Sequence, residues 1–457
     1  MKIIIIGDII LDINYNCISN RNAPEALNIP IFNITETNYL LGGVANIANN
    51  LNNLKNCDIE LISVIGKDNL SDKLIELLKT NNIKNKLFIE KKRITTQKYR
   101  LFKDNILYNR FDLENTYDIS SNIENDILNY IKSISDINAI IISDYNKGLI
   151  TNNLCKNLID YCNNNNILSF IDPKIKNIEK YKNSYFIKPN YYEAIEMSKE
   201  TYIFNIIDFY TNKLNIKNII ITNGDDGSYL YNNNKLTHIN KKYNYKLVDV
   251  TGCGDIYLSI FVYSFLNNNN MILSANIANY IANKNISVIG NYITNNDDIL
   301  LYEITDNNII YETEIDKIKL IKNNYDKITF TNGCFDIIHA GHIKLLQFAK
   351  KKGEILIVGL NSDNSIKQIK GENRPINNIK LRIELLKSLN IIDYIIIFDN
   401  LTPYNIIKEL KPYYLIKGSD YKEKKIIGKE YVKEILIYES NIEISTSIII
   451  NKINEYN

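Results

Sequence analysis

Short runs of β-branched residues, each bounded by turn residues, recur along this chain and constrain its fold more than any other feature. The runs lie at Ile3–Ile6, Ile59–Ile65, Ala139–Ser143, Ile167–Ile171 and Ile219–Thr222. Continuous apolar runs of this kind are typical of strands buried on both faces, as in a parallel sheet. Segments with helical spacing lie between them, at Val44–Leu51 and Leu70–Leu78. Strands that alternate with helices predict an α/β fold.

A second series of the same kind begins near residue 326. We expect strands at Ile328–Thr331, Ile355–Leu360, Tyr394–Phe398 and Tyr413–Lys417, and helices at Ile343–Lys350, Lys380–Leu389 and Tyr404–Leu410. Residues 295–325 are polar and weakly patterned, with one short candidate helix at Asp316–Lys322. A length of 457 residues also indicates more than one domain. We therefore expect a first domain at 1–312, a linker at 313–325 and a second domain at 326–457.

Composition and charge exclude several classes of protein. Hydrophobic residues make up 45% and charged residues 23%, as in globular proteins, and the net charge of +2 gives no sign of a nucleic-acid binder. The six cysteines form no CxxC pair and no zinc spacing, which fits a reducing compartment. The apolar run at the N-terminus is shorter than the roughly 7–15 residues of a signal peptide or the ~20 of a membrane span. We expect a cytoplasmic protein without membrane insertion.

The segment Asp249-Val-Thr-Gly-Cys-Gly-Asp255 carries the strongest chemical signal. It follows a strand-like run at Tyr245–Val248 and opens an apolar helix at Tyr257–Phe265. Gly252 and Gly254 at a helix N-terminus would point backbone N–H groups outward, where they can stabilise a transferring phosphoryl group. Asp255 can act as general base on a substrate hydroxyl. A capped helix start is the plain alternative, since Asp, Thr and Gly are common there, but seven residues in this order favour the phosphoryl-transfer site.

These residues resemble the C-terminal signature D-[TV]-T-G-A-G-D of the ribokinase-like (PfkB) family of sugar kinases. Cys253 stands in place of the usual Ala, and Ile256 stands where Thr is frequent. The resemblance implies a three-layer α/β/α domain. It also implies that Asp255 is the catalytic base and that the backbone of Gly252, Cys253 and Gly254 forms the anion hole.

Other segments agree with this family, although each has a plainer explanation as a turn or a cap. The resemblance implies that Gly42, Gly43 and Asn46, together with Asp12, approach the sugar. The element Asn190-Tyr191-Tyr192-Glu193 matches the family's N-x-x-E, whose amide and carboxylate share one face of a first helical turn. That arrangement suits a water-mediated Mg²⁺ site at Glu193, because Mg²⁺ keeps several waters. Thr222 and Gly224 follow a strand and are expected at the nucleotide-binding edge.

Two of the three histidines of the chain lie close together, in the segment that ends His339-Ala-Gly-His342. A metal site is one alternative, but no Glu follows the first His and no third ligand is near. A structural pair of histidines is another. The pattern H-x-G-H is similar to the signature of cytidylyltransferase-like nucleotidyltransferases. In that superfamily a substrate phosphate attacks the α-phosphate of a nucleotide and releases pyrophosphate. Catalysis then needs positioning and hydrogen-bond donors, which His339 and His342 could supply.

Downstream residues match the same superfamily in the expected order. The resemblance implies a smaller Rossmann-like domain with a parallel sheet. Its nucleotide-binding residues would be Gly333, Phe335, Asp336, Asn361, Asp363, Arg374, Lys417, Ser445, Thr446 and Ser447. Lys417 belongs to a K-G-x-D-Y segment, and residues 445–447 to an S-[ST]-[ST] element before a helix-like run.

The order of the two halves resembles the bifunctional heptose enzymes of Gram-negative bacteria. That family joins a D-glycero-β-D-manno-heptose 7-phosphate kinase to a heptose 1-phosphate adenylyltransferase, and its product, ADP-heptose, feeds the lipopolysaccharide core. The resemblance implies ATP and a sugar phosphate as substrates, Mg²⁺ with the ATP, and a homodimer. Lys98, Arg100 and Lys174 could hold a 7-phosphate by charge-assisted bonds, or could be solvated surface residues. Two rivals remain: the same folds acting on another sugar or polyol phosphate, with CTP in the second half, or a first half that only binds a ligand or mediates assembly.

Overall fold

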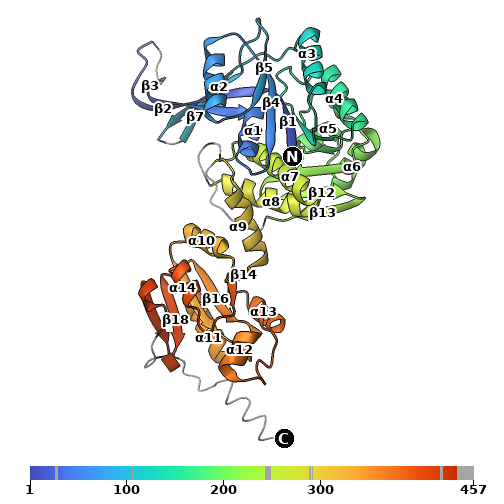
Figure 1. The fold of residues 1–457 in the computed structure, drawn as a ribbon. Helices are drawn as coiled ribbons and strands as arrows, with labels where there is room; N and C mark the ends of the chain where they lie inside the picture. Colours follow the sequence, from blue (N-terminus) through green and yellow to red (C-terminus); the bar gives the residue numbers. More distant parts are fainter. Residues whose placement is uncertain are drawn as a thin grey trace. The chain divides into compact units, whose positions relative to one another are not determined.

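The computed structural model describes residues 1–25, 29–104, 106–241, 249–287, 290, 292–421 and 426–439. It divides into two compact units, Met1–Asn296 and Asp297–Asn457, which are coloured blue to yellow and yellow to red (Figure 1). Each unit has its own sheets and its own hydrophobic core, so each is described separately below.

The first unit is built on a large, mostly parallel sheet. Among the described residues its strand order is β13-β12-β11-β10-β9-β8-β1-β4-β5, and only β12 and β13 run antiparallel. The strands are β1 Lys2–Gly7, β4 Asp58–Ile65, β5 Asn85–Ile89, β8 Ala139–Ser143, β9 Leu168–Asp172, β10 Phe186–Ile187, β11 Asn218–Thr222, β12 Ser228–Asn232 and β13 Lys235–Ile239. The five apolar runs from Ile3–Ile6 to Ile219–Thr222 that predict strands in this half each form one, while the strand-like run Tyr245–Val248 lies outside the described residues.

Helices cover both faces of this sheet. Ile4 and Ile6 of β1 join a core cluster with α3 (Ser121–Lys132), α4 (Asn152–Asn164), α5 (Tyr191–Ser198) and α6 (Ile203–Asp208). Their neighbours Ile3 and Ile5 are fully buried on the opposite face, because side chains alternate along a strand. In a second group of helices, α1 (Val44–Asn52) packs on α7 (Cys253–Asn268), and α7 packs on α8 (Met271–Asn285). The α/β prediction, with three layers in this unit, is confirmed.

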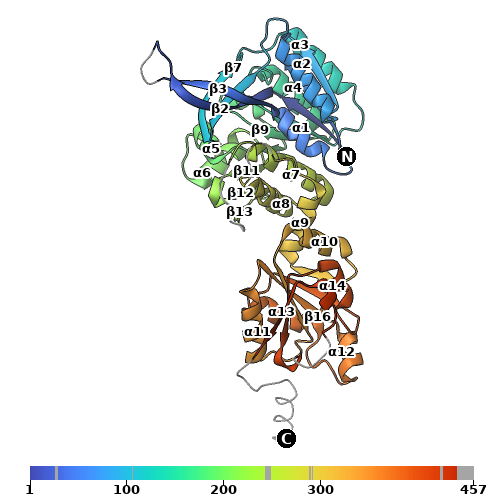
Figure 2. The same cartoon turned by 90° about the vertical axis from the view of Figure 1, so that its left-hand side faces the viewer.

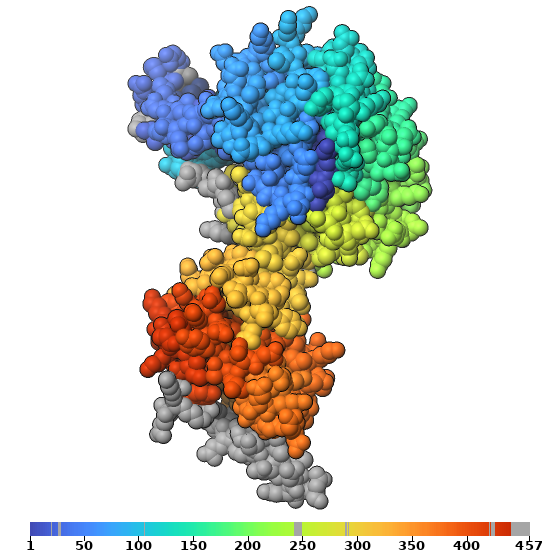
Figure 3. Space-filling view, viewed as in Figure 1, coloured from blue at the N-terminus to red at the C-terminus, as the bar shows by residue number. Residues whose placement is uncertain are grey.

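A separate sheet of the first unit was not expected from the sequence. Its order is β3-β2-β6-β7, from β2 (Ile9–Asn22), β3 (Pro30–Gly43), β6 (Gln97–Lys103) and β7 (Ile106–Leu113). The long strands β2 and β3 extend from the body of the unit, as the dark blue segment shows (Figures 2 and 3). Few residues of β3 and none of β7 are buried, so these two strands lack the buried apolar runs that mark the strands of the main sheet. The sheet brings Asp12, Lys98 and Arg100 into one structure.

The second unit is smaller and entirely parallel. Its described strands have the order β14-β17-β16-β15-β18-β19. They are β14 Ile309–Tyr311, β15 Ile328–Gly333, β16 Ile355–Asn361, β17 Tyr394–Phe398, β18 Tyr414–Gly418 and β19 Glu434–Tyr438. The helices are α9 Asn296–Asn307, α10 Ile315–Asn324, α11 Ala340–Lys350, α12 Asp363–Lys370, α13 Ile379–Ser388 and α14 Tyr404–Leu410. This is the parallel, Rossmann-like arrangement that the sequence predicts.

The division between the units falls earlier than the sequence indicates. The expected first domain ends at 312 and the expected linker covers 313–325, but the structure divides at 296/297. β14 pairs with β17 as an edge strand of the second sheet. Ile310, Ile318 and Ile321 are buried in the core of the second unit. A three-residue strand and a polar helix give too weak a pattern to reveal this. Among the described residues, no helix is both long and apolar enough to cross a membrane.

Candidate active sites

Asp255 lies in the first turn of α7, where the side chains of Asn46 and Tyr145 each donate to one of its carboxylate oxygens. Asn46 Nδ2 donates a hydrogen bond of 3.0 Å to Oδ2, and the Tyr145 hydroxyl donates to Oδ1. Burial, followed by the nearby Asp172 carboxylate, raises the pKa of Asp255 to about 6. A carboxylate that is ionised at neutral pH, with a proton affinity above that of a free Asp, is suited to general-base catalysis.

The positively charged Lys188 lies close to the Asp255 carboxylate. The buried Lys188 ammonium lies 2.9 Å from Asp172 Oδ1. A Cβ added to Gly254 would lie 3.6 Å from Lys188 Nζ, so this cation is next to the glycine turn that begins α7. The first N–H groups of a helix have no intrahelical acceptor and carry partial positive charge. The turn and the lysine together make a place for an anionic group beside Asp255.

A cavity of about 270 Å³ opens beside this turn. It is lined by Thr222, Gly224, Asp225, Gly227, Val250, Cys253, Gly254, Tyr257, Asn279, Ala282, Asn283 and Ile286. The predicted nucleotide residues Thr222, Gly224, Cys253 and Gly254 therefore meet in one cavity. Cys253, which replaces the usual Ala, fits without disruption, because its Sγ accepts a 3.0 Å hydrogen bond from Asn285 Nδ2.

The Asn190–Glu193 element serves as the cap of α5. Asn190 Oδ1 accepts from Glu193 N at 2.8 Å, and Glu193 Oε2 accepts from Asn190 N at 3.0 Å. Glu193 Oε1 accepts from Lys174 Nζ. Both oxygens thus have a protein donor, and their remaining lone pairs can accept bonds from the waters of a hydrated cation. Tyr191 donates to Thr201 O and Tyr192 is 68% exposed, so neither lines the cavity.

Neither Gly42 nor Gly43 has room for a side chain. A Cβ on Gly42 would lie 2.2 Å from Asp12 Oδ2. Gly43 has φ +59°, and a Cβ there would lie 2.4 Å from the carbonyl oxygen of Asp8. Asp12 is buried and pairs with Arg100 at 2.8 Å. The predicted sugar-binding residues Asp12, Gly42 and Arg100 are therefore in contact through Asp12.

Two further predicted residues meet at the ring of Tyr145. Lys98 Nζ lies 5.6 Å and Lys174 Nζ 5.9 Å from its centroid. The ring thus lies between Lys98 of the β3-β2-β6-β7 sheet and Lys174, which in turn pairs with Glu193.

Sequence analysis missed Tyr145, Asp172 and Lys188 as residues of this site. Tyr145 belongs to the segment Ser143-Asp-Tyr-Asn-Lys-Gly148, and Lys188 directly precedes Pro189-Asn190. A buried strand that ends in a charged residue was the available signal for Asp172 and Lys188.

In the second unit, His339 and His342 lie at the start of α11. His339 is the residue before the helix, and the two rings stack with centroids 3.8 Å apart. Burial, then His339 and Lys370, lowers the pKa of His342 to about 4, and burial also lowers the pKa of His339. Within the described part of the chain, neither Nδ1 atom has a hydrogen-bond partner. A Cβ on Gly341 would lie 3.1 Å from the His339 ring, which explains the glycine between the histidines.

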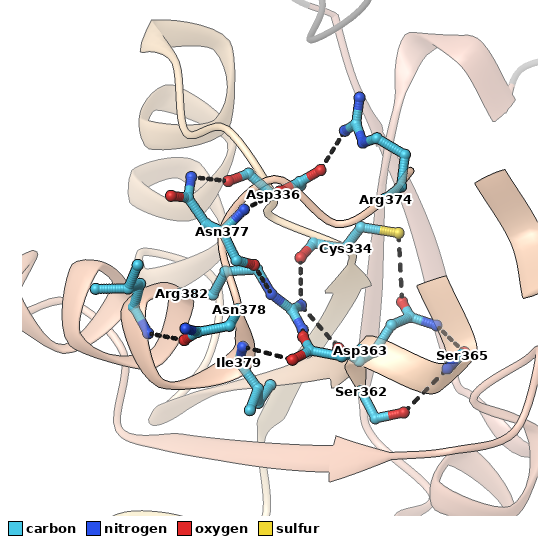
Figure 4. Close-up of polar contacts among 12 residues, drawn as sticks. Cys334, Asp336, Ser362, Asp363, Ser365, Arg374, Asn377, Asn378, Ile379 and Arg382 are labelled. Atoms are coloured by element: carbon cyan, nitrogen blue, oxygen red, sulfur yellow. Dashed lines mark hydrogen bonds and ion pairs between the residues drawn. The ribbon is translucent and has the colours of Figure 1, made fainter. Parts of the chain in front are cut away.

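Residues of the loop after β15 contact several of the other predicted site residues. Phe335 has φ +45° and its ring lies against Gly333 and His342. Asp336 pairs with Arg374 and accepts a 2.9 Å bond from Asn377 N. The basic residue expected to meet phosphate is therefore held by a buried carboxylate (Figure 4).

Arg382 of α13, which sequence analysis missed, is fully buried at the centre of this network (Figure 4). Its guanidinium donates to Cys334 O, Asn361 O and Asp363 Oδ1, each at 2.7 Å, and to Asn377 O at 3.1 Å. It thereby joins the ends of β15 and β16, the start of α12 and the loop that follows α12. A single Arg in an amphipathic helix gives no sequence signal of such a role.

Lys417, at the end of β18, donates to Asn332 Oδ1 next to the histidine loop. Ser445, Thr446 and Ser447 lie outside the described residues. Among the described residues, no group of three or more His, Cys, Asp or Glu side chains could hold a metal ion. The metal alternative for the histidine pair therefore gains no support from this geometry.

Both halves of the chain match known protein families. Residues 2–298 match the pfkB family of carbohydrate kinases, and residues 330–452 match the cytidylyltransferase-like family. The bifunctional protein HldE of Aliarcobacter butzleri is 35% identical over 468 residues, which cover 99% of this chain and 98% of that protein. The bifunctional protein HldE of Helicobacter pylori is 35% identical over 463 residues, with the same coverage.

Solved structures match the first unit in fold. Phosphofructokinase-2 from Escherichia coli superimposes with a TM-score of 0.56 at 15% identity, covering 66% of this chain and 99% of that one. Ribokinase from Arabidopsis thaliana superimposes with a TM-score of 0.53 at 14% identity, covering 66% and 97%. At such low identity the likeness shows a shared fold. The resemblance that the signature motifs predict is thus confirmed for both halves of the chain.

Proposed function

Because this chain belongs to the family of bifunctional HldE proteins, with a carbohydrate kinase half and a nucleotidyltransferase half, we propose that it makes ADP-heptose in two steps. The first unit phosphorylates D-glycero-β-D-manno-heptose 7-phosphate at O1 with ATP. The second unit transfers an adenylyl group from ATP to heptose 1-phosphate and releases pyrophosphate. A separate phosphatase removes the 7-phosphate between the steps, and the product enters lipopolysaccharide core synthesis. ATP and sugar phosphates as substrates fit a cytoplasmic enzyme.

The observation that carries the kinase half is Asp255 in the first turn of α7, beside the cavity of about 270 Å³. Asp255 accepts the proton of the anomeric hydroxyl, and the oxygen attacks the γ-phosphate of ATP as the bond to ADP breaks. The N–H groups of the Gly252–Gly254 turn and Lys188 stabilise the charge on the transferring group. Asp12, Gly42, Gly43 and Asn46 hold the sugar, and Lys98, Arg100 and Lys174 attract its 7-phosphate.

We propose that Mg²⁺ accompanies ATP in this half. The remaining lone pairs of the Glu193 carboxylate can accept hydrogen bonds from the waters around the ion, which suits Mg²⁺. When bound, the ion neutralises phosphate charge. Lys174, held by Glu193, adds a further positive charge on the same side.

The observation that supports adenylyl transfer by the second unit is the stacked pair His339 and His342. With a lowered pKa, His342 is neutral at pH 7 and keeps one ring N–H as a donor to the α-phosphate. Arg374 and Lys417 add positive charge near the loop after β15. We also propose that Asn361, Asp363 and residues 445–447 contact the nucleotide.

We propose that the chain forms a homodimer through β7. This strand is exposed along its whole length and carries the exposed residues Ile106, Leu107, Tyr108, Phe111 and Leu113. Large apolar residues gathered on one exposed strand are typical of an interaction surface. Light scattering of the intact chain measures the oligomeric state.

The experiment that tests the function is product analysis by mass spectrometry. The purified chain receives heptose 7-phosphate, Mg²⁺ and ATP, with and without a 7-phosphatase. We expect a bisphosphate alone in the first case and ADP-heptose only when the phosphatase is present. No phosphorylation of the heptose, while ATP still binds, would remove this substrate. Turnover with CTP or another sugar phosphate would support the rival with the same folds.

A further inference from the structure

The Tyr145 loop, after β8, reaches the predicted base from a distant part of the chain. Tyr145 and Asp255 are 110 residues apart, yet the phenol of Tyr145 donates to Asp255 Oδ1. Asn46 occupies the other oxygen. Each oxygen of the base thus has one neutral donor, and Tyr145 is the donor for which the sequence predicted no role.

The loop that carries Tyr145 is held by a buried carboxylate. Asp8, which directly follows β1, accepts hydrogen bonds from the backbone N–H groups of Tyr145 at 2.9 Å, Lys147 at 3.1 Å and Leu149 at 3.2 Å. Three bonds from alternate residues of one loop fix its path. These three hydrogen bonds therefore hold the loop that places the phenol next to Asp255.

The Tyr145 ring also has a defined place. Lys98 and Lys174, which belong to different elements, lie over it at 5.6 and 5.9 Å. Burial, and then Asp255, raises the pKa of the Tyr145 hydroxyl well above its usual value. The phenol thus stays protonated across the working pH range and remains a donor to the carboxylate.

We propose that Tyr145 is a positioning residue for the kinase reaction, which orients the Asp255 carboxylate and tunes its proton affinity through the phenol hydrogen bond. This inference rests on the proposed role of Asp255 as base. A hydrogen bond donated to the charged form of an acid stabilises that form. Without it, Asp255 holds its proton up to a higher pH and its carboxylate can rotate away from the substrate hydroxyl.

Other charged groups around Asp255 set the background for this effect. Asp172 at the end of β9 opposes its ionisation, and Lys188 next to β10 favours it. Lys174 and Cys253 also face the carboxylate. A Tyr145→Phe substitution changes none of these groups, so a change in the titration of Asp255 reports the phenol hydrogen bond.

The test compares kcat and KM of the intact enzyme against pH for wild type and Tyr145→Phe. We expect the midpoint of the acid limb to move up by roughly 0.5–1 pH unit, and kcat at the optimum to fall about tenfold. The KM for ATP should change less than threefold. An unchanged midpoint and rate in a folded Tyr145→Phe enzyme would overturn the inference and leave the role of Asp255 intact.

Tyr130→Phe is a matched control. Tyr130 also donates its hydroxyl to a carboxylate, that of Glu60, outside the site. This variant should keep the wild-type pH profile. If Tyr145→Phe destabilises the unit, 3-fluorotyrosine at position 145 keeps the ring and makes its hydroxyl a stronger donor. The midpoint should then move down, and an unmoved midpoint would count against the proposal.

An infrared titration separates this inference from the proposed function. The Asp255 carboxyl band, taken as the difference from Asp255→Asn, follows the same group without any sugar. A higher midpoint in Tyr145→Phe supports the hydrogen bond even if the heptose proves not to be the substrate. Equal midpoints in the two proteins would overturn it.

Discussion

At the scale of single residues, the chemistry proposed for the kinase half depends most on Asp255. We expect Asp255→Asn to lower kinase turnover at least ~10²-fold, because the amide cannot accept the substrate proton. In the wild type, kinase activity should rise as pH increases through about 6, since burial and Asp172 raise the pKa of this carboxyl to that value and only the ionised form is a base. Steady-state kinetics check both. Turnover within a few-fold of wild type would show that another group is the base.

In the second unit, the proposed chemistry depends most on His342. His342→Ala should abolish adenylyl transfer and leave the kinase rate unchanged, because the two sites lie in separate compact units. Pyrophosphate release and sugar phosphorylation, measured on the same sample, distinguish the two activities. Loss of both would indicate misfolding rather than loss of a donor.

At the scale of secondary-structure elements, buried polar side chains hold the loops that carry function. Asp8 fixes the Tyr145 loop in the first unit, and Arg382 joins four segments in the second. In both cases a charged group inside the protein satisfies several backbone atoms at once. Such groups order loops that have little apolar surface of their own.

Arg382→Met is expected to lower the free energy of unfolding of the second unit by about 3–5 kcal/mol, because Asp363 Oδ1 and three carbonyl oxygens lose the guanidinium that donates to them. Chemical denaturation measures the change, and adenylyl transfer should fall with it. Lys380→Met, at an exposed position of the same helix, should change stability by less than ~0.5 kcal/mol. Equal stability of the two variants would show that the Arg382 bonds are dispensable.

At the scale of the whole molecule, the boundary at 296/297 predicts which pieces fold. A chain that starts at residue 297 should unfold cooperatively and retain adenylyl transfer. A chain that starts at 326 lacks β14 and α10 and so loses the buried Ile310, Ile318 and Ile321. We expect a markedly lower melting temperature or aggregation for the shorter piece. Thermal unfolding of both tests this, and similar stability would restore the expected boundary near 326.

The sequence by itself determined the α/β class and the two-part organisation, and it supplied most of the candidate residues for both proposed sites. Runs such as Ile3–Ile6 and Ile355–Leu360 are short, rich in β-branched residues and bounded by turns, which favours strands in a sheet covered on both faces. The motifs around Asp255 and His339 are contiguous, so their chemistry is readable from local order alone.

Only the tertiary structure decided where the weakly patterned elements lie and which distant residues meet. The exposed strands of the β3-β2-β6-β7 sheet, the short β14 and the apolar face of α10 give weak local patterns, and their placement depends on partners distant in sequence. The same holds for Tyr145, whose hydroxyl meets a carboxylate 110 residues away, and for Arg382, whose four acceptors come from separate segments. Periodicity and motifs report how a residue relates to its neighbours in the chain, whereas a buried hydrogen bond is specified by the fold that brings its two ends together.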